Sequence, residues 1–406
     1  MSRDEVLVTG LGLVTPAGAE PEGVWRTVCE GVSTARPDPL LAGLPVAYSC
    51  QVAEFDAEAE LGGRLSRRLD RFTQFAVGAA RRAVDDAKLA APHWAAERVG
   101  VVLGTAGNSL DRYADEFRRL ADGSPRRVSP STLPRSLPSM SAAEAALELG
   151  AHGPNFVVSS ACASGATALG VARNMVRSGS CDVVLAGGSE SARVPITATG
   201  FAQLGALSRN PDPLRACRPF DRERDGFVLG EGAAVLVVES QAHARTRGAQ
   251  ARARLLGYGA SADAHHPTAP HPEARGAEQA IRGALADADR TPDRIHHVNT
   301  HGTATQLGDA AEAQALRRVF GEPPPATAAK GVLGHALGAS GAIEAALTVL
   351  ALQHQQVPPT AGLRLQDAGA EFDLVTRGPR NVAMEAALTT SFGFGGHNAA
   401  LVLATA

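Results

Sequence analysis

The alternation of short apolar runs with longer alanine-rich segments is the feature that most limits how this chain can fold. The short runs predict buried strands over Val6–Thr9, Val99–Leu103, Phe156–Ser159, Val183–Ala186, Ala233–Glu239, His297–Thr300 and Ala399–Leu403. The longer segments, rich in Ala, Leu, Arg and Glu, predict helices over Arg71–Lys88, Ser164–Ser178, Pro272–Ala288, Asp309–Phe320 and Gly341–Gln353. Strands that alternate with helices favour a layered α/β arrangement.

The length of the chain and two repeated motifs indicate a duplicated unit. A chain of 406 residues exceeds the size at which one hydrophobic core stops growing. Two short motifs occur twice in the same order, as Gly104–Ala106 with Gly302–Ala304 and Ala163–Ala166 with Ala339–Ala342. The motifs lie further apart in the first half, which indicates an insertion there. The expected organisation is an N-terminal half at 1–248, a C-terminal half at 249–406 and an insertion at about 107–138.

Composition and charge exclude several classes of function. A net charge of -3 argues against attraction of the whole surface to nucleic acid or to a membrane. No run approaches the roughly 18 apolar residues that a membrane span requires. The 5 cysteines are widely spaced and form no C-x-x-C pair, and the Met1 end resembles no signal peptide. We therefore expect a reducing, cytoplasmic location.

Cys162 lies between a predicted strand and a predicted helix, where a thiol can act as a nucleophile. The first turn of a helix has unpaired N–H groups and the positive end of the dipole, so we expect both to favour the thiolate. Its small neighbours Ala161 and Ala163 leave room for a substrate. A lone cysteine in an apolar segment is more often a small buried hydrophobe. The interpretation as a nucleophile therefore depends on residues further along the chain.

Three glycine-rich turns in the second half provide those residues. His301 ends a predicted strand, where side chains point into the crevice that binds ligands in α/β proteins. His335 lies in a turn that opens a predicted helix, and Phe394 lies in a turn whose backbone N–H can bind an oxyanion. Each histidine taken alone is more often structural. Together with Cys162 they supply a thiol, two imidazoles and a backbone donor, which acyl transfer requires.

Two other motifs are rejected. Gly10 and Gly12 begin like a dinucleotide-binding loop, but Thr15 stands in place of the third glycine, and a tight turn after the strand is preferred. The histidines at 265–271 and 296–297 lack the spacing of metal ligands, so we expect no metal.

Six segments, taken together, resemble one family over nearly the whole chain. They are VLVTGLGLVTPAG at the start, SSACASG around Cys162, RPFDRERDGFVLGEGAAVLVVE from Arg218 to Glu239, NTHGTATQLGD, KGVLGHALGASGAIE and SFGFGGHN. In this order they resemble the elongating, type II β-ketoacyl-acyl-carrier-protein synthases of the thiolase superfamily. The resemblance implies a five-layered αβαβα fold built from two similar halves, and a dimer.

The resemblance also implies roles for individual residues. A Cys-His-His triad carries over onto Cys162, His301 and His335. The other matched positions are a motif lysine, two supporting glutamates, a gate residue, an asparagine that closes the last motif and two pantetheine-binding threonines: Lys330, Glu312, Glu344, Phe394, Asn398, Thr303 and Thr305. Basic positions for docking an acidic carrier protein are Arg64, Arg67, Arg68, Arg126 and Arg127.

The implied reaction is a decarboxylative Claisen condensation of malonyl-acyl-carrier protein with an acyl chain held on Cys162, in type II fatty acid or polyketide synthesis. Both substrates are carried on phosphopantetheine, so no cofactor of its own is expected. A thiolase would need a second catalytic cysteine near the C-terminus, and no cysteine follows Cys217. A non-catalytic chain-length factor would lack Cys162, and the initiating subclass would have an asparagine at His335. Acyl length, pathway, and pairing with itself or with a chain-length factor stay open.

Overall fold

The structure, a computed structural model, describes residues 5–89, 94–107 and 110–406. Its main sheet contains ten strands within these residues. The first five along the chain are β1 (Val6–Val14), β4 (Val99–Gly104), β5 (Asn155–Val158), β6 (Val183–Glu190) and β7 (Gly232–Ser240). The last five are β8 (Ala253–Ala262), β9 (His297–Asn299), β10 (Ala326–Thr327), β13 (Ala386–Gly393) and β14 (His397–Ala404).

The two sets of five strands have the same topology. Their orders across the sheet are β5-β4-β6-β7-β1 and β10-β9-β13-β14-β8. In each set the second strand along the chain pairs in parallel with the third and the fourth, and the fifth pairs antiparallel with the fourth and the first. The sets join where Leu7 and Val8 of β1 pair with Arg254 and Ala253 of β8. The fold is therefore two equivalent sheets that meet at one edge.

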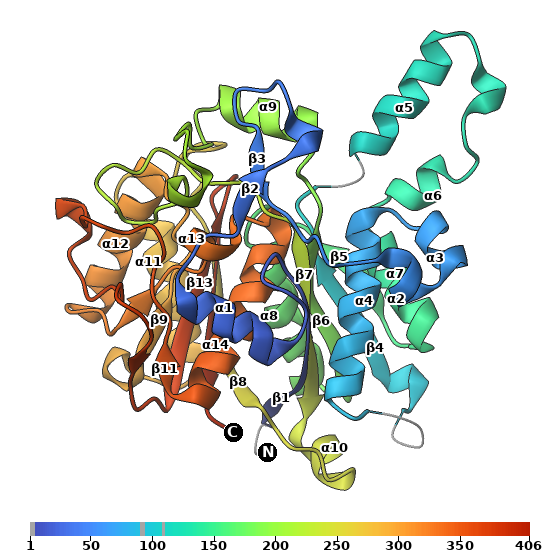
Figure 1. Ribbon diagram of the computed structural model, residues 1–406. Coiled ribbons are helices and arrows are strands. Elements are labelled where there is room, and N and C mark those ends of the chain that lie inside the picture. Colours follow the sequence, from blue (N-terminus) through green and yellow to red (C-terminus); the bar gives the residue numbers. More distant parts are fainter. Residues whose placement is uncertain (1–4, 90–93, 108–109) are drawn as a thin grey trace.

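Helices form three layers around and between these sheets. The central layer is α8 (Ser164–Arg177) and α14 (Ser340–His354), and each contacts strands of both sheets. On the outer side of the first sheet lie α4 (Arg71–Asp86) and α7 (Met140–Leu149), and on that of the second lies α11 (Arg275–Asp287) with α12 (Gln306–Phe320) beside it. Figure 1 shows α8 and α14 at the centre of the molecule. This five-layered αβαβα arrangement confirms the predicted thiolase-like fold.

Shorter elements surround the layers. The helices are α1 (Pro21–Glu30), α2 (Ala57–Leu61), α3 (Gly63–Arg68), α9 (Pro195–Gln203), α10 (Gln241–Thr246) and α13 (Lys330–Leu333). Two small two-stranded antiparallel sheets pair β2 (Ala35–Pro37) with β3 (Tyr48–Cys50), and β11 (Gln356–Val357) with β12 (Arg380–Asn381). The division of the chain after residue 248 stays a prediction.

Strand β1 is longer than predicted. The sequence suggested a turn after Thr9, yet the strand continues to Val14. A Cβ atom on Gly10 would lie 2.3 Å from the carbonyl oxygen of Ala83, and one on Gly12 would lie 1.9 Å from that of Ala79. Both alanines belong to α4, so the glycines allow this helix to lie directly on β1. The predicted turn is wrong because these glycines serve close packing inside a strand.

The segment predicted to be an insertion forms an arm that projects from the body of the molecule (Figure 1). It contains α5 (Leu110–Ala121), a short 3-10 turn at Pro125–Arg127 and α6 (Thr132–Ser136). Residues 108–109 of the predicted insertion lie outside the described residues. The side chains of Phe117 and Leu133 on this arm are each 64% exposed. In the part of the chain that the structure describes, no helix has the length and apolar character needed to cross a membrane.

Candidate active site

Cys162 lies in a strained turn between β5 and α8. Ala161, the residue before it, has a φ of 49°. This left-handed conformation is unfavourable for any residue that has a Cβ atom. The Ser164 hydroxyl fixes the turn, because it donates to the carbonyl of Ala161 at 2.6 Å and accepts from the N–H of Ser160 at 2.9 Å. A Cβ atom on Gly393 would lie 2.9 Å from the backbone nitrogen of Cys162. The glycine thus lets the end of β13 lie against the cysteine.

The Cys162 sulfur is a thiol at neutral pH. Burial raises its pKa to about 11, while the charge of Lys330 and the N–H groups of Phe394 and Cys162 act to lower it. The sequence predicted that a helix N-terminus would favour the thiolate. That prediction is wrong, because removal from water outweighs the nearby donors and Cys162 precedes Ser164, the first helical residue. The proton must therefore leave as the sulfur attacks.

His301 follows β9, and its ring is held by the Lys330 side chain. Lys330 Nζ lies 3.2 Å from His301 Nδ1 and 2.5 Å from the His301 carbonyl oxygen, and it pairs with the Glu344 carboxylate. Because an ammonium can only donate, Nδ1 accepts and the ring proton resides on Nε2. Burial lowers the pKa of His301, and the Lys330 charge lowers it further. His301 is therefore a neutral imidazole with its N–H at Nε2.

The Glu344 carboxyl is the buried partner of this lysine. Burial raises its pKa to about 7, although the adjacent Lys330 charge acts to lower it. A buried ammonium requires such a partner, since an unpaired buried charge is strongly destabilising. Glu344 therefore keeps Lys330 in place behind His301.

His335 faces His301 across the site. The two rings are nearly perpendicular with centroids 5.4 Å apart, and the Phe227 ring lies edge-on to His335 at 5.0 Å. The Ser340 hydroxyl lies 2.9 Å from His335 Nδ1. Burial and then the Lys330 charge lower the pKa of His335, so this ring is neutral as well. Since a hydroxyl can donate or accept, Ser340 allows His335 to present either a lone pair or an N–H at Nε2.

Glu312 of α12 fixes the backbone that bears His301. Its carboxylate accepts from the N–H groups of His301 and Gly302, both at 2.8 Å, and from the Thr390 hydroxyl at 2.7 Å. Burial raises the pKa of Glu312, an effect that these donors oppose. The carboxylate thus links α12, β13 and the turn after β9.

A cavity of about 510 Å³ reaches the cysteine and brings most of the predicted residues together. The predicted residues that line it are Cys162, His301, His335, Phe394, Glu312, Asn398, Thr303 and Thr305. Lys330 and Glu344 are not among the lining residues and lie behind His301. The thiol and both imidazoles therefore open onto one chamber.

The two threonines and the asparagine have structural partners within this wall. The hydroxyls of Thr303 and Thr305 lie 2.9 Å apart, and that of Thr305 also caps α12 by accepting from the N–H of Gly308 at 3.2 Å. This cap explains why α12 begins at Gln306, before the predicted start at Asp309. Asn398 donates to Asp263 at 2.8 Å.

The five predicted docking arginines do not line the cavity. Arg64, Arg67 and Arg68 lie on α3, and Arg126 and Arg127 lie in the short turn of the arm. All five are exposed. Arg67 lies 3.8 Å from Glu58, and Arg68 pairs with the buried Glu144. Arg135 of α6 donates to the Arg67 carbonyl at 2.9 Å, which ties the arm to α3.

Sequence reasoning missed several polar residues of the site: Ser340, Thr390, Asp263 and Glu190. The repeated Ala-Ser-Gly-Ala motif contains Ser340 and could have marked it. Glu190 is fully buried and accepts from the N–H groups of Ala106, Gly107 and Gly338 at 2.9, 3.0 and 3.4 Å. The Thr105 hydroxyl also donates to it at 3.4 Å. No sequence signal marks this carboxylate, because its partners are brought together only by the fold.

Comparisons with known proteins agree with this geometry. Residues 3–244 match the family model described as "Beta-ketoacyl synthase, N-terminal domain", and residues 252–364 match "Beta-ketoacyl synthase, C-terminal domain". A protein of Synechocystis sp. named 3-oxoacyl-acyl-carrier-protein synthase 2 is 39% identical, over 99% of this chain and 98% of its own length.

Two solved structures match the chain throughout. The ishigamide ketosynthase/chain length factor has a TM-score of 0.93 and 33% identity, and the match covers 100% of both chains. A type II PKS acyl-carrier protein in complex with its ketosynthase bound to the hexaketide gives a TM-score of 0.91 and 30% identity, again over 100% of both chains.

Proposed function

The chain belongs to the β-ketoacyl synthase family and is an acyltransferase, a β-ketoacyl-acyl-carrier-protein synthase, and from this premise we propose how its residues divide the reaction. The observation that supports the division is the single cavity lined by Cys162, His301 and His335. Condensation proceeds there in two half-reactions, acyl transfer to the sulfur and then decarboxylative carbon–carbon bond formation.

In the first half-reaction the Cys162 sulfur attacks an acyl thioester and the carrier thiol leaves. Because the pKa of Cys162 is about 11, a base must accept its proton as the bond forms, and His335 with its lone pair at Nε2 is that base. The N–H groups of Phe394 and Cys162, which bond the sulfur, are the donors for the oxyanion. One such donor contributes about 3–4 kcal/mol. His335 then passes the Cys162 proton to the departing carrier sulfur, which leaves as the thiol, and the acyl chain resides on Cys162.

In the second half-reaction a malonyl thioester occupies the cavity. His301 and His335 donate from Nε2 to its thioester oxygen, and carbon dioxide leaves as charge gathers on that oxygen. The enolate carbon attacks the acyl group on Cys162, which lengthens the chain by two carbons and expels the sulfur as a thiolate. This thiolate takes up a proton from solvent and so returns to the thiol. Lys330 does not touch the reacting carbon; it fixes the donor tautomer of His301. The Ser340 hydroxyl donates to His335 in this step, having accepted in the first. Between the two steps the ring therefore exchanges its proton on Nδ1 for one on Nε2 through solvent.

The substrates of this reaction are carried on the phosphopantetheine arm of an acyl carrier protein, with no cofactor resident in the enzyme. The hydroxyls of Thr303 and Thr305, which line the cavity, are the proposed hydrogen-bond partners of the arm. The basic residues on α3 and on the arm of the enzyme form the proposed docking surface for the acidic carrier. The 5 free cysteines suit the proposed cytoplasmic location.

A second candidate assigns the chain to the ketosynthase subunit of a heterodimer with a chain-length factor. The ishigamide structure is described by its title as a ketosynthase/chain length factor, and it matches the whole chain. The exposed Phe117 and Leu133 on the arm support a partner subunit of either kind. The native mass of the chain expressed alone distinguishes the two, because a homodimer forms without a second gene product.

The condensation assay with Cys162→Ala tests the proposed function. Loss of β-ketoacyl product is expected, because no sulfur remains to hold the acyl chain. Cys217→Ala is the matched control, since Cys217 is buried and does not line the cavity. Condensation by Cys162→Ala at a rate near that of the unmodified enzyme would overturn the proposal.

A further inference from the structure

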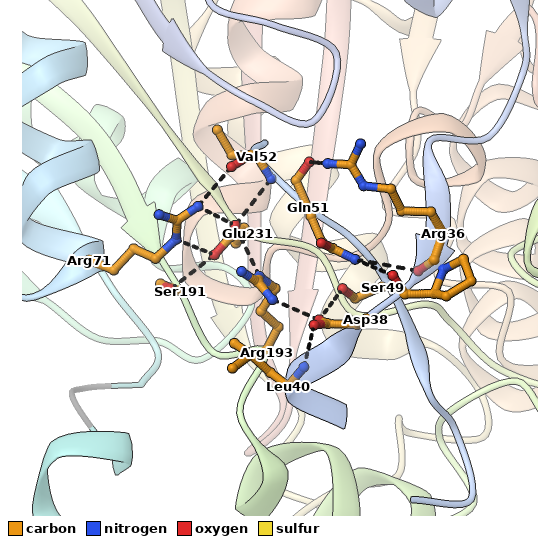
Figure 2. Close-up of polar contacts among 11 residues, drawn as sticks. Arg36, Asp38, Leu40, Ser49, Gln51, Val52, Arg71, Ser191, Arg193 and Glu231 are labelled. Atoms are coloured by element: carbon orange, nitrogen blue, oxygen red, sulfur yellow. Dashed lines mark hydrogen bonds and ion pairs between the residues drawn. The ribbon is translucent and has the colours of Figure 1, made fainter. Parts of the chain in front are cut away.

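A buried ion-pair network lies outside the cavity, between β6 and α9. Arg193, two residues before α9, places Nη1 2.8 Å from the Asp38 carboxylate and Nε 3.0 Å from the Glu231 carboxylate. Both carboxylate side chains are 0% exposed, and that of Arg193 is 12% exposed. Figure 2 shows Arg193 between the two acids, with Arg71 on the opposite side of Glu231.

The two carboxylates are fixed by other elements of the fold. Asp38 accepts from the N–H of Leu40 at 2.9 Å and from the Ser49 hydroxyl at 2.6 Å, so it belongs to the β2–β3 hairpin. Glu231 accepts from the N–H of Val52 at 3.1 Å and pairs with Arg71 of α4 at 2.9 Å. Two buried anions are thus balanced by two arginines. Of these two arginines, Arg193 lies next to α9 in the chain, whereas Arg71 belongs to α4.

Helix α9 has little packing at its start. Its buried residues are Ala198 and Ala202, Ile196 is 64% exposed, and the larger apolar contact, that of Phe201, lies at the far end of the helix. The side chain of its N-cap residue Val194 forms no capping hydrogen bond. Two buried alanines fix a short helix weakly compared with larger apolar side chains. The ion pairs of Arg193 therefore provide the nearest strong anchor for the start of α9.

The far end of α9 supports the reactive wall of the cavity. The Phe201 ring packs against that of Phe394 with centroids 6.1 Å apart and edge-on against Phe227 at 5.4 Å. Phe227 in turn contacts His335. Phe201 therefore touches the residue that provides the proposed oxyanion donor and the residue that supports the proposed base.

We infer that Arg193 is a positioning residue for acyl transfer: its two ion pairs hold α9 so that Phe201 sets the place of Phe394 beside Cys162. The inference rests on the proposed acylation of Cys162. It assigns to this network a role beyond stability, because displacement of the Phe394 backbone removes a donor from the oxyanion without removing any reacting group. A misplacement of about 1 Å can cost about 100-fold in rate.

The test compares two rates of modification at Cys162 in the full chain. Intact mass spectrometry follows acylation by octanoyl-pantetheine, which needs the oxyanion donors, and alkylation by iodoacetamide, which forms no oxyanion and depends on the Phe394 N–H only through its smaller effect on the Cys162 pKa. In Arg193→Met we expect acylation to slow by roughly tenfold or more while alkylation stays within about twofold. Arg193→Lys, which retains one charge, should recover part of the acylation rate.

Two variants separate positioning from a general loss of stability. Arg71→Met removes the other cation from Glu231 but leaves α9 anchored, so its acylation rate should stay near that of the unmodified enzyme. Phe201→Ala leaves the ion pairs intact and should reproduce the acylation defect, which keeps the test decisive if Arg193→Met does not fold. Equal acylation rates in Phe201→Ala and the unmodified enzyme, or equal losses in Arg193→Met and Arg71→Met, would overturn the inference. Failure of the unmodified enzyme to become acylated would instead contradict the proposed function.

Discussion

Gly165 of α8 and Gly341 of α14 occupy reciprocal positions where the two central helices cross. A Cβ atom on Gly165 would lie 2.7 Å from the backbone nitrogen of Ala342, and one on Gly341 would lie 2.9 Å from that of Ala166. Gly165 thus faces Ala342, the last residue of the second Ala-Ser-Gly-Ala motif, and Gly341 faces Ala166, the last residue of the first. The motif repeated in the sequence is a pseudo-twofold contact at the centre of the fold.

The equivalence extends to the reactive turn. Ala161 and Leu337 precede the two copies of the motif by the same number of residues, and both are left-handed, with φ of 49° and 43°. The next residue is Cys162 in the first copy and Gly338 in the second. The duplicated turn therefore provides a nucleophile in one half, while the second half provides the two histidines.

The crossing of the central helices predicts that Gly165→Ala destabilises the protein. The added methyl group would overlap backbone atoms of α14, and overpacking of this kind costs about 1–3 kcal/mol. Gly200→Ala in α9 is the control, because nothing lies within 4 Å of a Cβ atom there. Chemical denaturation should show a lower free energy of unfolding for Gly165→Ala alone. Equal stability of the two variants would contradict close approach of the helices.

The geometry at His301 predicts a selective loss in His301→Ala. Removal of one donor to the developing enolate oxygen should slow release of carbon dioxide from malonyl-carrier protein by about 100- to 1000-fold. Acylation of Cys162 should persist, because its proposed donors are N–H groups of Cys162 and Phe394. His297→Ala is the control, since His297 lies on β9, the strand that precedes His301, with Nδ1 2.9 Å from the Pro325 carbonyl, and does not line the cavity. Equal loss in both variants would indicate a structural role for His301.

The raised pKa of Cys162 predicts how its alkylation depends on pH. The thiolate is the reactive form, and burial raises the pKa of the Cys162 thiol from about 9 to about 11. The rate of iodoacetamide modification should therefore rise about tenfold per pH unit from pH 7 to beyond 9. Peptide mapping after timed exposure measures this rate at Cys162 alone. A plateau at or below pH 9 would show that the thiolate is stabilised, as the sequence first suggested.

The arginines on α3 predict a salt-dependent affinity for the carrier. Arg67 is exposed and only loosely paired with Glu58, so its charge is available to an acidic partner. Arg67→Glu should raise the Kd for acyl carrier protein several-fold. Added salt should bring the Kd values of the variant and the unmodified enzyme closer together, because it screens the charge of Arg67. Arg294→Glu, a change at a side chain that lies beyond α11 and is 55% exposed, serves as the control in the same titration. Indifference to both Arg67→Glu and salt would exclude this docking surface.

The sequence predicted the layered fold and the approximate position of many elements because their apolar periodicity is strong. Strands β8 and β13 were missed, since Gly and Ser interrupt the apolar pattern in both, and Thr interrupts it in β13 as well. The glycines of β1 were taken for a turn because a sequence does not reveal which helix will lie on a strand. Matched motifs brought Cys162, His301 and His335 to attention, and the structure shows them around one cavity.

Electrostatic details were beyond the sequence for a physical reason. The high pKa of Cys162 and the neutral state of His301 both arise from burial, which depends on packing between halves of the chain. The Arg193 network likewise joins three segments far apart in sequence. The protonation state of a buried group and the partners of a buried charge can be assigned only when the residues packed around them are known.

The central claim is that acyl transfer and condensation share the Cys162 sulfur. A single-turnover experiment loads the enzyme from octanoyl-carrier protein, adds malonyl-carrier protein, and follows the protein by intact mass and peptide mapping. We expect an octanoyl group on the Cys162 peptide that disappears at the rate at which β-ketodecanoyl-carrier protein forms. An octanoyl group on another residue, or product formed while the octanoyl group stays on Cys162, would contradict the central claim.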